Sequence, residues 1–250
     1  WEFIRLATLT GGRSQEVGVN ADKLNEFFSS VVSDDCRAKL TIRQSCDQIE
    51  SFHIKPVLTS EVQLALKNLN GRTAPGPDNL PAILLRDYAD SLSHSVTSLF
   101  NHSIAAHTYP TCWKEADVAA VWKGKGSKTD PGSYRPISLL SILARVFERL
   151  VARQLTDYCN KSAIIPLQQF GFRANSSCES ALISATNSCL QAIDRGAYVG
   201  ALLVDLAKAF DTISHQRLVD ELQEIGVGTD SLLWFITFLE NRTQRVKLGS

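Results

Sequence analysis

The chain has 250 residues, of which 44% are hydrophobic and 21% charged, and its 26 basic residues balance its 26 acidic residues. This composition excludes disordered and collagen-like classes. Apolar runs stay well short of the roughly 18 residues that a membrane-spanning helix needs, so we expect no membrane partner. The sequence contains no methionine and begins at Trp1. We therefore expect it to be a piece of a longer protein.

Cysteine and histidine spacing predicts neither a disulfide framework nor a zinc site. The six cysteines form no Cys-x-x-Cys pair, and the five histidines do not stand at zinc-site spacing from them. A reduced, intracellular chain is the resulting expectation.

Positive charge gathers in the middle of the chain. Between Lys114 and Arg153 there are eight Lys or Arg residues against four acids, which leaves the compensating negative charge elsewhere. Within this stretch Arg145, Arg149 and Arg153 follow helical spacing. We interpret the arginines as a solvated helix face in preference to a phosphate-binding ridge.

Hydrophobic periodicity and cap signals divide the chain into helices and short strands. Asn20 is the expected N-cap of the first helix, and Ser60 with Gln63 forms the capping box expected to begin the second. The predicted helices cover residues 20–32, 60–69, about 81–107, 141–159, 178–194, 215–225 and 230–240. The predicted strands cover residues 118–122, 198–204 and 244–248, with a connector at 33–58 and a turn-rich loop at 124–133.

A carboxylate follows the apolar run from Tyr198 to Val204. If that run is a buried strand, Asp205 stands at its exit, where ligands collect in α/β proteins. An aspartate half out of water needs a cation or hydrogen-bond donors, and Mg²⁺ is the usual cation beside a phosphate substrate. Helix capping is the alternative for Asp205, and for Asp211 it is at least as good an explanation.

The basic loop from Lys123 to Lys128, followed by Arg135, is the second candidate site. Its glycines let the backbone approach an anion closely, while Lys and Arg supply positive charge and donors suited to phosphate oxygens. The alternative is an exposed hairpin loop without a ligand.

Two other phosphate chemistries are excluded by neighbouring residues. Gly126-Ser127-Lys128-Thr129 leads into a turn at Asp130-Pro131, whereas a P-loop opens a helix. An aspartyl phosphotransferase of the haloacid dehalogenase type needs a second acid two residues after the first, and Ala207 and Ile213 occupy those positions.

Four sequence blocks resemble, in order and spacing, the reverse transcriptase of non-LTR (LINE-type) retrotransposons. The blocks are Ala74-Pro75-Gly76-Pro77-Asp78 with Leu80-Pro81; Lys123 to Gly126 with Asp130-Pro131 and Tyr134 to Leu140; Gln169 to Arg173; and Asp205 to Asp211. Leu24 to Phe28 also resembles the segment that such polyproteins carry between endonuclease and polymerase. The resemblance runs from about residue 20 to the end of the chain.

The resemblance implies a metal-dependent centre at Asp205. This residue corresponds to the first catalytic carboxylate, which in the family holds two Mg²⁺ ions with two aspartates of a later motif, and the Leu206 carbonyl would share one ion. Two ions would stabilise both the attacking 3′-oxygen and the leaving pyrophosphate. The only adjacent aspartates, Asp34-Asp35, lie far upstream, so we expect the isolated chain to be inactive.

The resemblance also assigns substrate contacts. Lys123, with Lys125 as second choice, and Arg135 would clamp a deoxynucleoside triphosphate, and Phe210 would be the steric gate against a ribose 2′-OH. The implied template- and primer-binding residues are Gln169, Gly171 and Arg173. The expected partners are an RNA template, a DNA primer and deoxynucleoside triphosphates, with salt-sensitive and sequence-indifferent binding of the strands.

From this resemblance we expect an α/β (α+β) fold, helix-rich with a short antiparallel sheet. It would comprise the fingers and start of the palm of a right-hand polymerase, with the palm incomplete and no thumb. The expected layout is a connector with one helix at 1–58, fingers at 59–197 and the first part of the palm at 198–250.

Two alternatives stay open: a non-catalytic nucleic-acid-binding remnant, and the polymerase part of a group II intron maturase, which shares the Asp205 block. The segments Asn25 to Phe28 and Tyr134 to Ser138 favour the LINE type. The compartment, nucleus or cytoplasmic ribonucleoprotein particle, is not decided by the sequence.

Overall fold

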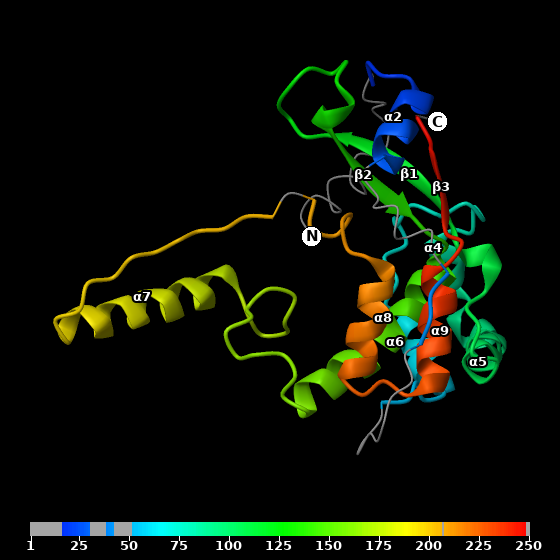
Figure 1. Cartoon of the computed structure of the whole chain (residues 1–250). Coiled ribbons are helices and arrows are strands. Elements are labelled where there is room, and N and C mark those ends of the chain that lie inside the picture. Colours follow the sequence, from blue (N-terminus) through cyan, green and yellow to red (C-terminus); the bar gives the residue numbers. More distant parts are fainter. Residues whose placement is uncertain (1–16, 31–38, 43–51, 207, 249–250) are drawn as a thin grey trace. The chain divides into compact units, whose positions relative to one another are not determined.

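The computed structural model describes residues 17–30, 39–42, 52–206 and 208–248 (Figure 1). The chain divides into two units by its internal contacts. The first unit comprises Trp1–Leu155 and Phe210–Ser250, and the second comprises Thr156–Ala209. The Asp34-Asp35 pair and much of the predicted connector lie outside the described residues.

Every helix predicted from the sequence is present. The helices are α2 (Ala21–Ser29), α3 (Thr59–Lys67), α4 (Ala82–Asp87), α5 (Ala89–Ala105), α6 (Ile142–Lys161), α7 (Cys178–Asp194), α8 (His215–Glu224) and α9 (Thr229–Leu239). Asn20 caps α2 as expected, because its side-chain oxygen accepts a hydrogen bond from the Asp22 amide at 2.6 Å. None of the described helices has both the length and the apolar character needed to cross a membrane.

The cap of α3 differs from the prediction. The helix begins one residue earlier than Ser60, and the Glu61 carboxylate accepts a hydrogen bond from the Leu58 amide at 3.0 Å. The glutamate satisfies a free amide of the first turn by itself. The predicted pairing of Ser60 with Gln63 is therefore wrong, and Gln63 instead donates to Asp90 of α5.

A three-stranded sheet has the order β2-β1-β3, with β1 at Glu115–Trp122, β2 at Tyr134–Leu139 and β3 at Thr243–Val246. The pairing of β1 with β2 is antiparallel, from Asp117↔Leu139 to Trp122↔Tyr134. β3 pairs with β1 in parallel, so the short sheet is mixed where we expected an antiparallel one. Pro136 fits in β2 because an edge strand can spare one amide donor.

Helix α2 packs on one face of this sheet. Its buried residues Leu24 and Phe28 form a core with Val19, Val118 of β1 and Tyr134 of β2. The upper part of Figure 1 shows α2 beside the three strands. The amphipathic helix predicted from the sequence therefore supports the β1–β2 hairpin.

A second core of aromatic rings joins the helices of the first unit. The Phe100 ring stacks on the Phe147 ring with 4.5 Å between centroids, and the Tyr109 ring meets the Trp234 ring edge-on at 5.5 Å. Described residues of the predicted connector also contribute buried side chains, namely Leu40, Phe52, Ile54 and Val57. These described residues of the connector are thus part of the core, although the connector sequence has no helical or strand period.

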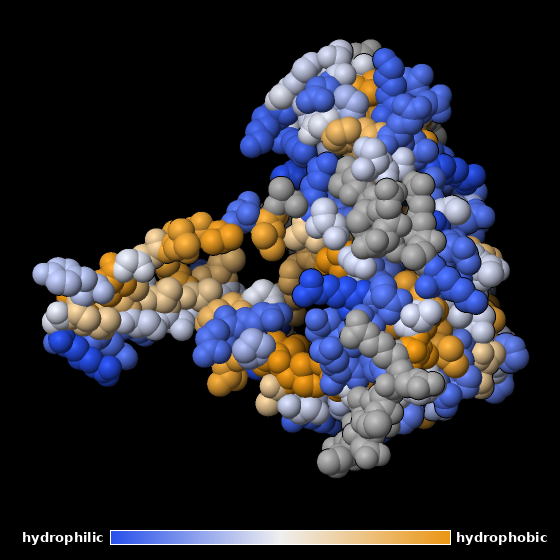
Figure 2. Space-filling view, in the orientation of Figure 1, coloured by the Kyte–Doolittle hydropathy of each residue, from blue (hydrophilic) through white to orange (hydrophobic). Residues whose placement is uncertain are grey.

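The predicted strand at Tyr198–Val204 is wrong. These residues form no regular secondary structure, and the side chains of Leu202 and Leu203 are 89% and 90% exposed. A strand needs a hydrogen-bonded neighbour, and the described sheet contains none of this segment. Helix α7 likewise buries none of its residues, and apolar side chains gather on the surface of this second unit (Figure 2).

The Ala74–Asp78 segment is fixed against the start of α6. Arg145 Nη2 donates a hydrogen bond to the Ala74 carbonyl at 3.0 Å, and burial is the main cause that lowers the pKa of Arg145. Arg153 pairs with Glu61 at 2.6 Å. The arginine stripe therefore makes structural contacts at both of its ends, and Arg149 between them is exposed.

We predict that Gly76→Ala destabilises the protein by about 2 kcal/mol. A Cβ at this position would overlap the backbone of Leu140 and Ser141, which cannot move aside like a flexible side chain. Gly71→Ala is the control because its Cβ would meet chiefly the Arg86 guanidinium. Urea unfolding followed by circular dichroism measures both variants; equal stabilities would contradict the close approach.

A partly buried carboxyl group, that of Glu148, gives a prediction about pH. Glu148 accepts a hydrogen bond from the Tyr109 hydroxyl at 2.6 Å and lies 3.8 Å from Arg242. Burial nevertheless raises the pKa of Glu148 above its ordinary value of 4.5. The folded state then holds this proton more tightly than the unfolded state, so the contribution of Glu148 to stability falls as pH rises through and above 4.5.

Glu148→Gln should remove this pH dependence while keeping an acceptor for Tyr109. We expect the free energy of unfolding of the variant, relative to the wild type, to increase on the order of 1 kcal/mol between about pH 4 and pH 7. Urea unfolding across that range measures the difference, with the exposed Glu224→Gln as control. A constant difference would show that Glu148 ionises as easily in the folded state as in the unfolded state.

Candidate functional site

The loop between β1 and β2 is held by hydrogen bonds at its base and across its interior. The Lys123 amide donates to the Ser133 carbonyl at 2.8 Å, which extends the strand ladder past Trp122. Asp130 accepts from the Gly132 amide at 3.0 Å and from the Ser133 hydroxyl at 3.3 Å. The predicted turn-rich loop is therefore an ordered structure that includes the short 3₁₀ turn Pro131–Ser133.

Gly126 is required by the shape of this loop. Its φ of +85° lies in the left-handed region, and a Cβ there would overlap the Ser133 hydroxyl. The Tyr134 hydroxyl donates a hydrogen bond to the Lys128 carbonyl of the loop at 2.8 Å. Since the Tyr134 ring belongs to the α2 core, the loop is connected to the interior of the first unit.

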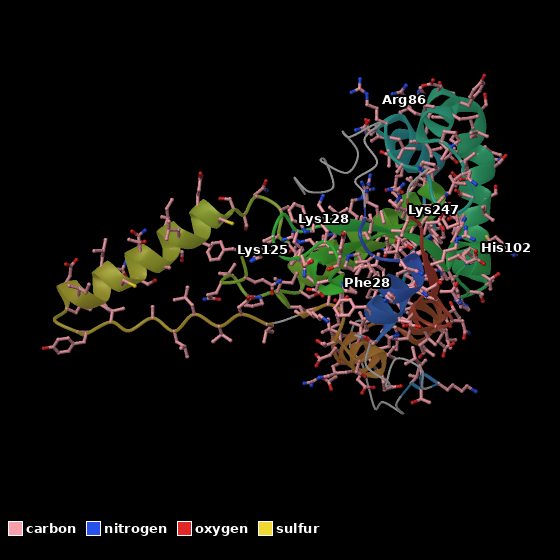
Figure 3. All side chains as sticks on the ribbon, turned by 90° about the horizontal axis from the view of Figure 1, so that it is seen from above. Phe28, Arg86, His102, Lys125, Lys128 and Lys247 are labelled. Atoms are coloured by element: carbon pink, nitrogen blue, oxygen red, sulfur yellow. The ribbon has the colours of Figure 1, made fainter. Side chains whose placement is uncertain are left out.

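The cationic side chains of the hairpin reach its surface. Lys123 is exposed, and its ammonium donates to the Gly132 carbonyl at 2.6 Å. Lys128 lies 5.7 Å from the centroid of the Trp122 ring, and Lys125 makes no hydrogen bond or ion pair with any described residue. Both Lys125 and Lys128 are marked on the hairpin in Figure 3. Arg135 is exposed on β2, opposite Val121.

The acidic residues between Lys114 and Arg153 offset the positive charge of the hairpin less than their number in the sequence indicates. Asp117 is buried at 3% exposure and pairs with Arg245 of β3 at 2.6 Å and with Lys247 at 3.6 Å. The partly buried Glu148 lies beside Tyr109 of the aromatic core, and Asp130 accepts hydrogen bonds from neutral groups of the loop. Of the four acids, Asp117 thus has its charge offset by cations outside the basic stretch, while Asp130 remains an exposed acid of the loop.

Asp205 and Leu206 belong to the second unit, where both are exposed. No helix begins at Asp205, and Ser214 instead of Asp211 caps α8, so neither capping alternative holds. Among the described residues, no three His, Cys, Asp or Glu side chains form a group that could hold a metal ion. The described residues thus do not complete the two-ion site implied by the resemblance.

The remaining predicted residues lie at the surface. Phe210 lies in a turn and is 74% exposed. In the second unit, the backbone amide of Gln169 donates to the Pro166 carbonyl at 3.0 Å, and Arg173 Nη1 donates to the same carbonyl at 3.1 Å. The exposed Gly171 lies between them.

The structure brings two groups of predicted residues together. Lys123, Lys125 and Arg135 share the β1–β2 hairpin, and Gln169 with Arg173 shares one carbonyl in a loop of the second unit. Sequence reasoning assigned no role to the residues that fix the hairpin, namely Asp130, Ser133 and Tyr134. The signal available was the Asp-Pro-Gly-Ser turn followed by an aromatic residue.

The chain belongs to the reverse transcriptase family. The sequence model described as "Reverse transcriptase (RNA-dependent DNA polymerase)" matches residues 124–249, from the hairpin loop past β3. The curated relatives place the chain with the non-LTR retrotransposon type of this family, as the sequence blocks predicted. Members of the family generally use divalent metal ions.

Three curated relatives illustrate the match. "Probable RNA-directed DNA polymerase from transposon BS" of Drosophila melanogaster is 33% identical over 175 residues, 70% of this chain and 19% of the relative. "RNA-directed DNA polymerase from mobile element jockey" of the same species is 29% identical over 212 residues, which are 81% of this chain and 23% of the relative. "Retrovirus-related Pol polyprotein from type-1 retrotransposable element R2" of Popillia japonica is 26% identical over 195 residues, which are 78% of this chain and 26% of the relative. The chain spans about a fifth of the length of such relatives.

We predict that Asp130→Ala loosens the hairpin loop. The variant loses the acceptors for the Gly132 amide and the Ser133 hydroxyl, so the free energy of unfolding should fall by about 1 kcal/mol. Hydrogen exchange at the Gly132 amide should also become faster. Lys125→Ala, in the same loop, is the control and should leave both quantities unchanged. An unaltered exchange rate in Asp130→Ala would mean that other contacts hold the loop.

Proposed function

We propose that this chain forms the nucleotide-binding part of an RNA-directed DNA polymerase, a nucleotidyltransferase that extends a DNA 3′-OH with deoxynucleotides on an RNA template during retrotransposition. Its partners are then an RNA template, a DNA primer and deoxynucleoside triphosphates. Membership of the reverse transcriptase family supports the class of reaction. The ordered, cationic β1–β2 hairpin is the observation that carries the proposal to residues of this chain.

In this proposal the hairpin binds the triphosphate. Arg135 offers a planar fork of donors, and Lys125 offers an ammonium group that no described residue engages. Lys123 has three donors, of which one is used by the Gly132 carbonyl. A loop that is already ordered loses little conformational entropy when it binds an anion.

The other predicted residues have roles in the same scheme. Asp205 and the Leu206 carbonyl contribute to a Mg²⁺ site that needs further carboxylates, and Phe210 is the ring that limits the sugar to a deoxyribose. Template or primer lies near the loop of the second unit, at Gln169, Gly171 and Arg173. The relatives are polymerases of transposable elements, which favours this function over that of an intron maturase.

Hairpin variants test the triphosphate site. We expect Arg135→Gln and Lys125→Gln each to weaken the binding of a fluorescent dATP analogue about tenfold, because each removes a charge-assisted contact. Lys55→Gln is the matched control, since Lys55 is also exposed but lies outside the hairpin.

Melting temperatures of all variants establish that they are folded. Affinities equal to that of the wild type in both hairpin variants would overturn the hairpin as the triphosphate site. A loss in Lys55→Gln of the same size would show that any positive charge on the chain suffices.

A further inference from the structure

A pocket of about 800 Å³ lies within the first unit, apart from the tip of the hairpin. Its lining includes three cationic side chains, Lys39, Lys114 and Arg242, and one carboxylate, Glu240. The net formal charge of these groups is positive even with the histidine of the lining neutral. A volume of this size exceeds what a single small ion fills and is in the usual range of pockets for organic ligands.

Lys114 is an unusual residue for the wall of a pocket because it is only 8% exposed. Its ammonium makes no ion pair with any described residue, although Glu240 is near enough to act on its charge. Burial is the main cause that lowers the pKa of Lys114. Lys114 Nζ is not among the buried side-chain atoms that lack a partner, so the cation lines the pocket without a direct counter-ion, and a bound anion would supply one.

His215 supplies a second unsatisfied group. Its Nδ1 is buried and has no hydrogen-bond partner among the described residues. His215 is also the first residue of α8, where the positive end of the helix dipole favours an anion. Arg242, in contrast, is held by other contacts, since it donates to the Phe238 carbonyl at 3.0 Å and lies over the Phe238 ring.

The pocket lies on the other face of the sheet from Arg135. Ser138, in its lining, stands opposite Val118 in the β1–β2 register, and Val118 faces the α2 core. Arg135 stands three residues earlier in the same strand, so alternation places it on the opposite face. An anion in this pocket would therefore occupy a different place from a triphosphate held by Arg135.

We propose that this pocket, the Lys114 pocket, binds a backbone phosphate of a single-stranded nucleic acid, with Lys114 and His215 as the contacting residues. The proposal rests on the proposed function, which supplies a strand as partner. A strand suits the site because one nucleotide unit fills a volume that a free phosphate cannot, while Lys39 at the exposed edge can meet the next phosphate.

Three ligands and two sets of variants test the Lys114 pocket. A labelled single-stranded RNA of about 12 nucleotides, its DNA counterpart and a fluorescent dATP analogue are titrated into the 250-residue chain. Lys114→Gln and His215→Ala should each weaken RNA binding about tenfold and leave dATP binding within about twofold of the wild type. Arg135→Gln should show the reverse pattern, and Lys55→Gln should change neither.

The possible outcomes separate this proposal from the proposed function. RNA binding that is unchanged in Lys114→Gln and His215→Ala, with dATP binding still lost in Arg135→Gln, would overturn the Lys114 pocket alone. Loss of dATP binding in the pocket variants would overturn its separation from the hairpin. A wild type that binds neither ligand would overturn both proposals. Comparison of the RNA with the DNA strand, and competition by inorganic phosphate, tell whether the sugar or the phosphate is recognised.

Discussion

The antiparallel pairing of β1 with β2 is the constraint on which the candidate site depends. The register from Asp117↔Leu139 to Trp122↔Tyr134 fixes where the loop begins and ends. The same register places Arg135 on one face of the sheet and the Tyr134 ring in the α2 core on the other. A slip of one residue would exchange these two side chains, exposing the ring and burying the guanidinium. The α2 core therefore holds the register, and the register presents the cations.

Two acids of the first unit, the buried Asp117 and the partly buried Glu148, form contacts away from the tip of the hairpin. Asp117 forms ion pairs with Arg245 of β3 and with Lys247. Glu148 accepts a hydrogen bond from Tyr109 of the aromatic core. These carboxylates pin β3 and α6 to the rest of the first unit without neutralising the loop. An exposed, positive hairpin on a rigid base is the arrangement that triphosphate binding requires, because anions are bound best by groups already in place.

Local signals in the sequence predicted the helices well, since periodicity and caps such as Asn20 act over a few residues. One failure is local, since Glu61 rather than the predicted pair Ser60 and Gln63 caps the start of α3, and the others involve contacts distant in sequence. The run Tyr198–Val204 has strand composition, but a strand forms only where another strand can pair with it. Strand β2 was not predicted, because its sequence contains Pro136, a residue that only an edge strand tolerates. The hairpin cations could be chosen from the resemblance, whereas the Lys114 pocket joins residues from 29 to 244 that no local pattern connects.

An NMR titration of the uniformly ¹⁵N-labelled chain with a deoxynucleoside triphosphate would test most directly whether the hairpin is a preformed triphosphate site. We expect the largest amide shifts between Lys123 and Arg135, with small changes at Lys114 and His215 and in the aromatic core. The loop amides should also be slow to exchange before ligand is added, because the loop is ordered by Asp130 and Tyr134. Shifts concentrated outside residues 123–135 would contradict the assignment of the triphosphate to this hairpin.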